Sequence, residues 1–399
     1  MNDSQLQQVR HDATTTVRRL VDRAVHALPK MFNPGAGMFC YKLKRVAGCL
    51  VQEGVSPRYT AMTLLGLHRL EQSGAQVPID LKPVLDRLLS NTDWADNVGD
   101  LGLLLWLCAQ VAPDRLVEVE RRFPIQNALT RFTTGREGMS MHLAWFLTGL
   151  SYCSAVSDDQ EKLGHMARKA FHLLIQNQGP YAYFGHLARR GSLKGRIRGW
   201  IGSFADQVYP IYALTQFSKV FGHDSALQRA RECALAICEA QGPLGQWWWH
   251  YDSRSGGVFE EYPVFSVHQH GMAPMTLLAL GKATNTNFDP WIYKGLDWIS
   301  KHNELSVDMD DPSASVIWRC IRQSSLKRYA NALLHARRSG LHPGPGGLTV
   351  LFECRPYELG WLLYGLVNLL HEPVWLARNS HEPGSVPSKR LQPWSNRDN

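Results

Sequence analysis

The sequence predicts an all-α protein built as a single α/α toroid, in which a ring of buried inner helices is surrounded by outer helices. Three observations predict this fold class. Apolar helical stretches recur along the 399 residues, amphipathic stretches alternate with them, and signals for β-strands are confined to one short region. Alternation that repeats about every 40 to 65 residues is typical of stacked helical hairpins. We expect roughly six or seven hairpins within residues 1–375.

The inner helices are expected where apolar residues cover every side of a helix, because such a helix is buried on all sides. Two of these stretches are nearly the same string, AMTLLGL at 61–67 and APMTLLAL at 273–280. This similarity supports a repeated structural unit. The predicted inner helices begin near Ser56, Asn97, Met141, Asp206, His270, Asp311 and Tyr357.

The outer helices and the remaining segments follow from different patterns. Residues 225–238 and 291–299 have one charged face, as expected for helices that are half exposed. Alternating apolar residues over 246–265, around a Gly-Gly turn, predict a short β-hairpin near the barrel mouth. Residues 376–399 are polar and rich in Pro and Ser, so we predict a disordered tail.

Composition limits the class of protein. The chain is 44% hydrophobic, has no apolar run long enough for a membrane span, and begins without the apolar core of a secretory signal. Its eight cysteines form no CxxC pair and lie mostly in apolar stretches, which is typical of reduced, buried thiols. These features predict a cytoplasmic protein.

Part of the net charge of +8 is concentrated in the basic segment 189–201, where Trp200 and Ile201 follow several Arg and Lys residues. One interpretation is a solvated loop. The other is a patch for phosphate or for an anionic membrane surface, which would make the protein membrane-associated at its periphery. No motif for nucleic-acid recognition accompanies the segment, so we expect no nucleic-acid partner.

Polar residues gather at the predicted starts of the inner helices. In a toroid these helix ends converge on one central cavity, so residues from distant repeats become neighbours. The set also has aromatic residues around it, and an acid beside aromatic walls suits a cationic or a carbohydrate intermediate. The candidate binding residues are Arg58, Tyr59, Asn97, Tyr209, Trp247, Trp249, Tyr251, Tyr262, Trp318 and Arg355, and the candidate catalytic residues are Asp206, His268, His270, Asp308, Asp310, Asp311 and Glu353.

The string Asp308-Met-Asp310-Asp311 places three carboxylates before a predicted apolar helix. Like charges and desolvation favour the protonated form of a carboxyl group, which is the form a general acid needs. Pro312 fits the first turn of a helix, so Asp311 is expected to cap it and Asp310 to donate the proton. His268 or His270 is expected to hydrogen-bond Asp310 and restore its proton.

A metal site formed by His268, His270 and Asp206 is a rival interpretation, although an H-x-H pair is a weak signal without a third ligand at fixed spacing. We therefore expect no metal. The sequence contains no nucleophile elbow, no P-loop and no dinucleotide glycine fingerprint, and it indicates no cofactor.

With these residues the chain resembles the terpenoid-cyclase and prenyltransferase α/α toroids, especially the squalene-hopene-cyclase type. The DMDDPSASVIW string at 308–318 is similar to the Asp-x-Asp-Asp-Thr-Ala motif of class II cyclases, although Pro312-Ser313 replaces Thr-Ala. The strings QGPLGQW at 241–247 and KGLDW at 294–298 resemble the two halves of the Gln-Trp repeat of that group.

The resemblance implies acid-initiated cyclisation of an isoprenoid. Asp310 would be the proton donor, Asp308 and Asp311 its supports, and the aromatic residues a cation-stabilising wall. Class II cyclases place the active site between two toroids, whereas this chain is long enough for one. A homodimer, or a lid made of residues 180–203 and 246–266, would have to close the cavity.

Two other functions stay open. A glycan-active toroid (a hydrolase, lyase or sugar epimerase acting on an oligosaccharide) would use Asp206, Glu353 or Asp310 as acid and base. Trp247 to Trp249 would then be sugar platforms. A non-catalytic toroid would use the same acids as helix caps and the aromatic residues as core.

Overall fold

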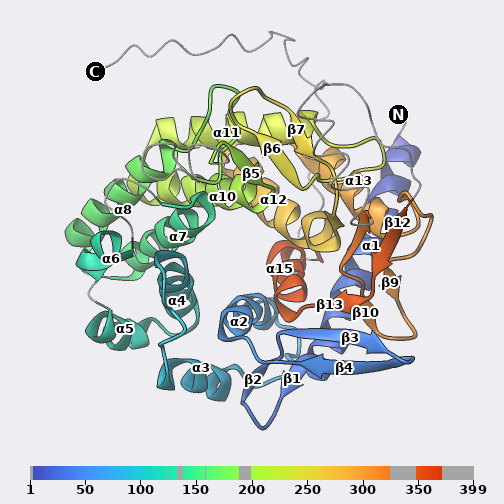
Figure 1. Ribbon diagram of the computed structural model, residues 1–399, viewed down its shortest axis with the longest axis horizontal. Helices are drawn as coiled ribbons and strands as arrows, with labels where there is room; N and C mark the ends of the chain where they lie inside the picture. The colour runs from blue at the N-terminus through green and yellow to red at the C-terminus, as the bar shows by residue number, and fades with distance from the viewer. Residues whose placement is uncertain are drawn as a thin grey trace.

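In the computed structural model the chain forms a closed ring of inner helices surrounded by a second layer of helices (Figure 1). The structure describes residues 3–123, 125–132, 138–157, 159–187, 199–323 and 347–370. Within these residues the ring contains six inner helices, and each packs against the next until the last one packs against the first. The inner helices, in ring order, are α2 (Pro57–Gln72), α4 (Val98–Val111), α7 (Ser140–Val156), α10 (Ala205–Phe221), α12 (Ala273–Thr284) and α15 (Pro356–Leu366).

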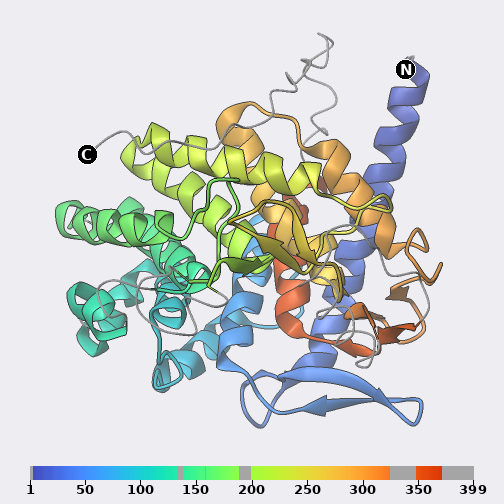
Figure 2. The same cartoon turned by 45° about the horizontal axis from the view of Figure 1, so that its top comes forward.

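The outer layer returns the chain after each inner helix, so all inner helices run in the same direction and begin at the same end of the ring. We call this end the mouth. A π-helical turn, His268–Met272, leads into α12 there. Figure 2 shows α1 running along the outside of the ring. The outer helices are α1 (Asp3–Met31), α3 (Leu81–Ser90), α5 (Leu116–Arg122), α6 (Ile125–Phe132), α8 (Gln160–Ile175), α11 (Asp224–Glu239) and α13 (Asp289–Ile299), with short 3-10 turns at Pro113–Arg115 and Val367–Leu370.

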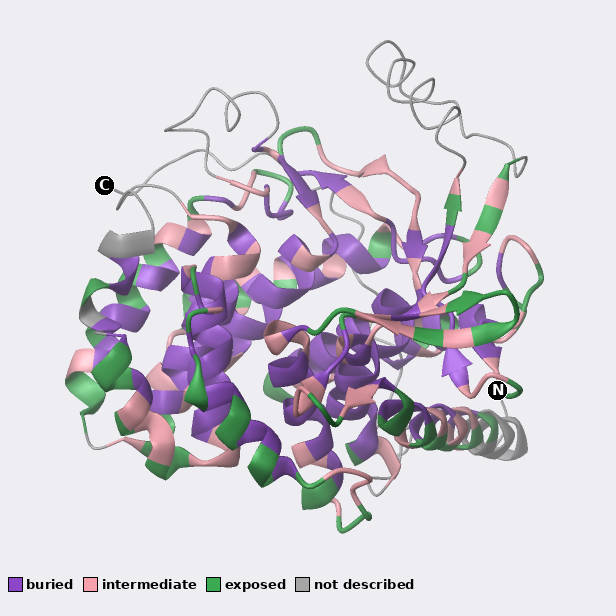
Figure 3. Cartoon of the chain, turned by 60° about the horizontal axis from the view of Figure 1, so that its bottom comes forward, coloured by how far each residue is buried: buried purple, intermediate pink, exposed green. Residues whose placement is uncertain are grey.

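Most residues of the inner helices are buried (Figure 3). Close packing between them depends on glycine. A Cβ atom on Gly66 of α2 would lie 2.1 Å from the carbonyl oxygen of Gly360 in α15. A Cβ atom on Gly102 of α4 would lie 2.3 Å from the backbone nitrogen of Phe146 in α7. These glycines let neighbouring inner helices approach with their backbones almost in contact.

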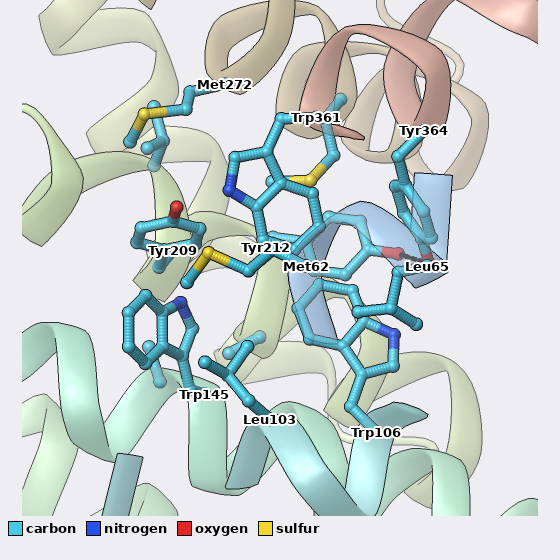
Figure 4. Packing of buried hydrophobic residues seen from close by; sticks show 14 of the residues in the cluster. Met62, Leu65, Leu103, Trp106, Trp145, Tyr209, Tyr212, Met272, Trp361 and Tyr364 are labelled. Carbon is cyan, nitrogen blue, oxygen red and sulfur yellow. Dashed lines mark hydrogen bonds between the residues drawn. The ribbon is translucent and has the colours of Figure 1, made fainter. Parts of the chain in front are cut away.

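The half of the ring away from the mouth is filled by aromatic side chains (Figure 4). Trp106 stacks between Tyr152, Tyr212 and Trp361, with ring centroids 5.4 to 5.9 Å apart. The hydroxyl groups of Tyr152, Tyr212 and Tyr364 hydrogen-bond one another at 2.8 to 3.3 Å. These rings and hydroxyl groups are bound to one another, so we look for a polar site toward the mouth.

Short strands connect the helices and form five small antiparallel sheets. Three of these sheets have three strands, in the orders β5-β6-β7, β12-β11-β8 and β13-β3-β4, and the others are the pairs β1-β2 and β9-β10. The strands are β1 (Phe32–Asn33), β2 (Met38–Phe39), β3 (Lys42–Val46), β4 (Cys49–Glu53), β5 (Ile201–Ser203), β6 (His250–Asp252), β7 (Val258–Glu260), β8 (Val264–Phe265), β9 (Asp310–Asp311), β10 (Val316–Ile317), β11 (Cys320–Gln323), β12 (Leu348–Leu351) and β13 (Glu353–Cys354).

The predicted fold class is confirmed: the chain is a single α/α toroid with a β-hairpin, β6–β7, within 246–265. The inner helix predicted after Asp311 is wrong, because that segment forms the β9–β10 hairpin. Asp311 accepts hydrogen bonds from the Ser313 hydroxyl (2.6 Å) and from the Ala314 backbone (3.0 Å), and Ser315 has a positive φ of 54°. These bonds build a turn in place of a helix start.

Two other expectations lie at least partly outside the described residues. The tail 376–399, with the domain boundary at 375, is one of them, and residues 189–198 of the basic segment are the other. Of that segment, Trp200 packs against the Phe259 ring at 5.7 Å and Ile201 is buried in β5. Among the helices that the structure describes, none combines the length and apolar character that crossing a bilayer requires.

Candidate active site

The aspartates of the 308–311 string lie outside the ring, where the β9–β10 hairpin packs against the outer helix α1. Asp310 is buried and accepts a hydrogen bond from Arg23 Nε at 2.5 Å and a second one from Arg19 Nη1. Both guanidinium groups belong to α1. Asp311 accepts hydrogen bonds from Arg45 at 2.6 Å and from Trp318 Nε1 at 3.2 Å. The string therefore joins the hairpin to its neighbours by ion pairs.

The assignment of Asp310 as a proton donor is wrong. Asp310 is bound by two guanidinium groups outside the ring, away from the ends of the inner helices where the predicted cavity lies. Asp311 is itself bound by Arg45 and Trp318, so it is not the support that was predicted for Asp310. Burial raises the pKa of Asp308, and its Oδ1 accepts the backbone N–H of Asp310 at 3.1 Å.

The two histidines expected beside Asp310 are placed elsewhere. His268 packs against Phe204 at 4.5 Å and against Phe265 at 5.1 Å, and its Nδ1 lies 3.4 Å from the Trp247 carbonyl oxygen. His270 is buried in the π-helical turn. Burial lowers the pKa of both imidazoles to about 3, so both are neutral and neither restores a proton to Asp310.

The mouth holds a different pair of aspartates. Asp100 lies in the first turn of α4 and is almost fully buried. Arg58 of α2 binds it with both arms, from Nε to Oδ1 at 2.5 Å and from Nη2 to Oδ2 at 2.6 Å. Asn97 caps α4 and donates its side-chain amide to Asp100 Oδ2 at 2.7 Å. This bidentate geometry fixes both the position and the orientation of the Asp100 carboxylate.

Asp206 occupies the first turn of α10 and collects four donors from three segments. The backbone N–H of Met141 lies 3.2 Å from Oδ1. The Ser203 backbone and hydroxyl donate to Oδ2 at 3.0 and 2.9 Å, and His186 Nδ1 lies 3.1 Å from the same oxygen. The Asp206 side chain is 2% exposed and that of His186 is 45% exposed. The imidazole therefore connects the buried carboxylate to the surface of the mouth.

His142 lies between these two carboxylates, at the start of α7. Its ring packs onto Gly99, where a Cβ atom would lie 2.8 Å from the imidazole, and onto Trp145 with centroids 6.0 Å apart. Burial lowers the pKa of His142, while the charges of Asp100 and Asp206 oppose that change. Three consecutive inner helices thus contribute Asp100, His142 and Asp206 to one cluster.

The α15 side of the mouth is basic and aromatic. Arg355 donates to the Tyr59 hydroxyl at 2.9 Å, and the Tyr59 ring lies 4.5 Å from that of Tyr357. Glu353 lies on β13 at the edge of this group, 3.1 Å from Lys42 Nζ and 3.7 Å from Arg355. Glu353 is therefore held by two cations beside the mouth and away from the Asp100 cluster.

The predicted aromatic platforms separate into buried and accessible groups. Trp247 and Tyr251 are fully buried, stacked on Phe204 at 5.6 Å and on Tyr183 at 5.2 Å. Trp249 is partly exposed and lies 4.9 Å from Phe265.

The other aromatic candidates occupy different places. Tyr209 lies beneath the mouth, between Trp145 and Trp361 (Figure 4). Trp318 belongs to the hairpin outside the ring, and Tyr262 donates to Glu304 at 3.0 Å. Trp249 and Tyr59 are thus the candidate platforms that face solvent near the mouth.

One residue of the mouth, His186, was missed by the sequence analysis, whereas Asp100 and His142 belong to the polar residues that gather at the predicted helix starts. His186 lies in a connection without a helix start, so no pattern marks it. Asp100 and His142 follow predicted helix starts, which is the signal that identifies them. In the described part of the chain, no group of three or more His, Cys, Asp or Glu residues has the arrangement of a metal site.

The fold is similar to the α/α toroids seen in solved structures of glycoside hydrolases. No known protein family matches the sequence, and no curated protein matches it. The unsaturated glucuronyl hydrolase of Bacillus sp. GL1 has a similar structure, with a TM-score of 0.55, 14% identity, and coverage of 90% of this chain and 97% of that one. The enzyme from Streptococcus agalactiae gives 0.56 and 12%, covering 91% and 94%.

A heparin-specific unsaturated glucuronyl hydrolase gives a TM-score of 0.51 and 13% identity, covering 92% of this chain and 97% of that chain. At these identities the likeness shows a shared fold. It corrects the resemblance to terpenoid cyclases, since these three structures, which match over nearly their whole length, are glycoside hydrolases. The position of Asp310 outside the ring agrees with this correction.

Proposed function

We propose that the chain is a glycan-active enzyme that binds an oligosaccharide at the mouth and uses Asp206, with Asp100 opposite, for its chemistry. One observation carries the proposal: two buried carboxylates begin inner helices on either side of His142. Reactions at a glycosidic bond need one group that delivers a proton and another that removes one or stabilises positive charge.

The partners of each aspartate assign its role. Asp100 is held by both arms of Arg58, and in the proposed reaction it stabilises positive charge on the sugar. Asp206 is bound by His186, whose imidazole is partly exposed and is a kind of group that can donate or accept a proton. The Asp206–His186 pair is therefore the route for the proton.

The mouth also indicates the class of sugar. The N-termini of six parallel helices point toward it, and each carries partial positive charge. Arg58 and Arg355 add two guanidinium groups. An acidic sugar, such as a uronic acid, fits this potential. Two of the structures with this fold hold oligosaccharides that begin with dGlcA, which supports the same class.

Trp249 and Tyr59 complete the proposed site as platforms for sugar rings. Both are aromatic, partly exposed and close to the mouth, and sugars pack their C–H faces onto such rings. Their loss should weaken binding more than turnover.

The test is incubation with a panel of neutral and uronic-acid oligosaccharides, followed by mass spectrometry. Wild-type protein should cleave or modify an acidic member. Asp206→Asn should abolish that activity, and Asp310→Asn should retain it at a temperature where the variant is folded. A wild-type protein that leaves every glycan intact, or an Asp206→Asn variant with full activity, would overturn the proposal.

A further inference from the structure

A second pair of imidazole and carboxylate lies in the β5-β6-β7 sheet. His250 Nδ1 of β6 is 2.7 Å from Glu260 Oε2 of β7. The side chains are 18% and 23% exposed, so both are covered for the most part yet reach solvent. A short bond of this kind orients the ring and fixes which nitrogen carries the proton.

The register of the sheet connects this pair to Asp206. Ser203 of β5 lies directly opposite His250, and His250 lies directly opposite Glu260. Residues opposite one another in antiparallel strands project from the same face. Ser203, His250 and Glu260 therefore form a row across three strands, and the Ser203 hydroxyl at one end donates to Asp206 at 2.9 Å.

A two-group mechanism needs its acid and its base to be separated. Neighbouring strands are about 5 Å apart, so His250 is one strand spacing from the serine that binds Asp206. Acid and base groups that act on opposite sides of a sugar are typically about 6.5 to 9.5 Å apart, which leaves room for a water molecule. In the row, Ser203 separates the His250 imidazole from the Asp206 carboxylate.

The adjacent aromatic residue gives the row a place for a sugar. Trp249 precedes His250, with ring centroids 4.7 Å apart, and is parallel to His268 at 6.1 Å. Its backbone is anchored by bonds with Phe204 N at 2.9 Å and Glu261 O at 3.1 Å. These backbone bonds hold the segment, so the sheet does not depend on the His250–Glu260 contact for its geometry.

We propose that His250, oriented by Glu260, is the second proton-transfer residue of the mouth and acts as the base opposite the Asp206–His186 pair. The inference rests on the proposed function. With Nδ1–H donated to Glu260, the free Nε2 takes a proton from a water molecule as the water oxygen bonds to the anomeric carbon. The bond from that carbon to the glycosidic oxygen breaks, its electron pair stays on the oxygen, and the His186 imidazolium protonates it. One water is consumed.

The experiment compares variants of the full chain on the acidic oligosaccharide that the wild type processes. His250→Asn keeps a donor to Glu260 but cannot carry the proton, so kcat should fall by about 100-fold or more while KM changes little. In His250→Ala, added imidazole should restore part of the activity. Unfolding temperatures should stay close to that of the wild type.

The matched control is His68→Ala. His68 also lies beside a carboxylate, because its Nδ1 is 3.4 Å from Glu71, one turn further along α2. It lies toward the end of α2 that is away from the mouth. Its loss should leave kcat unchanged. Full activity in His250→Asn, a loss that imidazole does not restore in His250→Ala, or an equal loss in His68→Ala would overturn the inference alone. Inert wild-type protein would overturn the proposed function and this inference with it.

Discussion

The aspartates of the 308–311 hairpin and those of the mouth differ in the segments that hold them. Asp310 joins a β-hairpin to the outer helix α1, and both of its partners are arginines. Asp206 begins the inner helix α10, and its partners are backbone N–H groups, a serine and a histidine. The segment that carries an aspartate therefore decides whether it lies near the converging ends of the inner helices.

The comparison teaches that partner type separates a structural carboxylate from a reactive one. Both partners of Asp310 are guanidinium groups, which keep their charge and do not exchange protons. One partner of Asp206 is an imidazole, a kind of group that can donate or accept a proton. In the proposed function, only the Asp206 arrangement contains a side chain that passes a proton.

The largest expected effect is the loss of activity in Asp206→Asn. Proton transfer by a positioned group contributes about 100- to 10,000-fold to a rate, so kcat on the responsive glycan should fall within this range. Steady-state kinetics measures the change, and circular dichroism checks that the helices are retained. An equal fall in kcat for Asp310→Asn would contradict the distinction between the two aspartates.

The next effect is on stability. Removing the Asp310 carboxylate leaves Arg19 and Arg23 without their partner, and breaking a buried ion pair costs about 3 to 5 kcal/mol. Arg19 is 36% exposed and water replaces part of the interaction, so we expect about 3 kcal/mol for Asp310→Ala. Urea unfolding measures it. Unchanged stability would show that the hairpin does not depend on these two ion pairs.

The fold could be predicted because its signal lies in long apolar segments. Residues 98–111 and 140–156 are apolar on every side, and no arrangement other than burial between neighbours accommodates such helices. The helix predicted after Asp311 was wrong because turns and helix starts favour the same residue types. Asp, Pro and Ser favour both, and the β-branched Val316 and Ile317 that follow favour the strand.

The site could be predicted only where it coincides with a helix start. Asp206 was identified in this way, and so were Arg58 and Asn97. His186 lies in a connection, and the His250–Glu260 pair depends on strand register, which the sequence of a short hairpin does not specify. Asp310 was chosen for its neighbours in sequence, whereas its partners in space are 291 and 287 residues away.

Gly66→Ala tests whether the mouth depends on the close contact of α2 and α15. The added methyl group would meet the Gly360 carbonyl, and overpacking of this kind costs about 1 to 3 kcal/mol. We expect about 2 kcal/mol by thermal or urea unfolding. Because α2 carries Arg58 and α15 follows Arg355, KM for the acidic glycan should rise as well.

The control for this variant is Gly35→Ala, whose nearest neighbour would be 3.5 Å away in ordinary contact. Gly35→Ala should change neither the free energy of unfolding nor the KM for the acidic glycan appreciably. Equal effects at the two glycines would show that the backbone contact between the inner helices has no special role in shaping the mouth.

The smallest effect is expected at Asp311 and depends on pH. Burial raises its pKa, but hydrogen bonds from Ser313, Ala314, Arg45 and Trp318 outweigh burial and lower the pKa to about 2. A lowered pKa in the folded state stabilises the protein above about pH 4, and this stabilisation disappears as the pH falls toward 2.

Asp311→Asn removes this contribution at neutral pH. A shift of this size corresponds to about 2 kcal/mol at most, and solvent at Arg45, which is 33% exposed, reduces it to about 1 kcal/mol. Urea unfolding at pH 7 and pH 3 should show the variant less stable at pH 7, with the difference shrinking at pH 3. Activity should not change, because the hairpin is remote from the proposed reaction. A difference that grows at low pH would contradict the assigned ion pair.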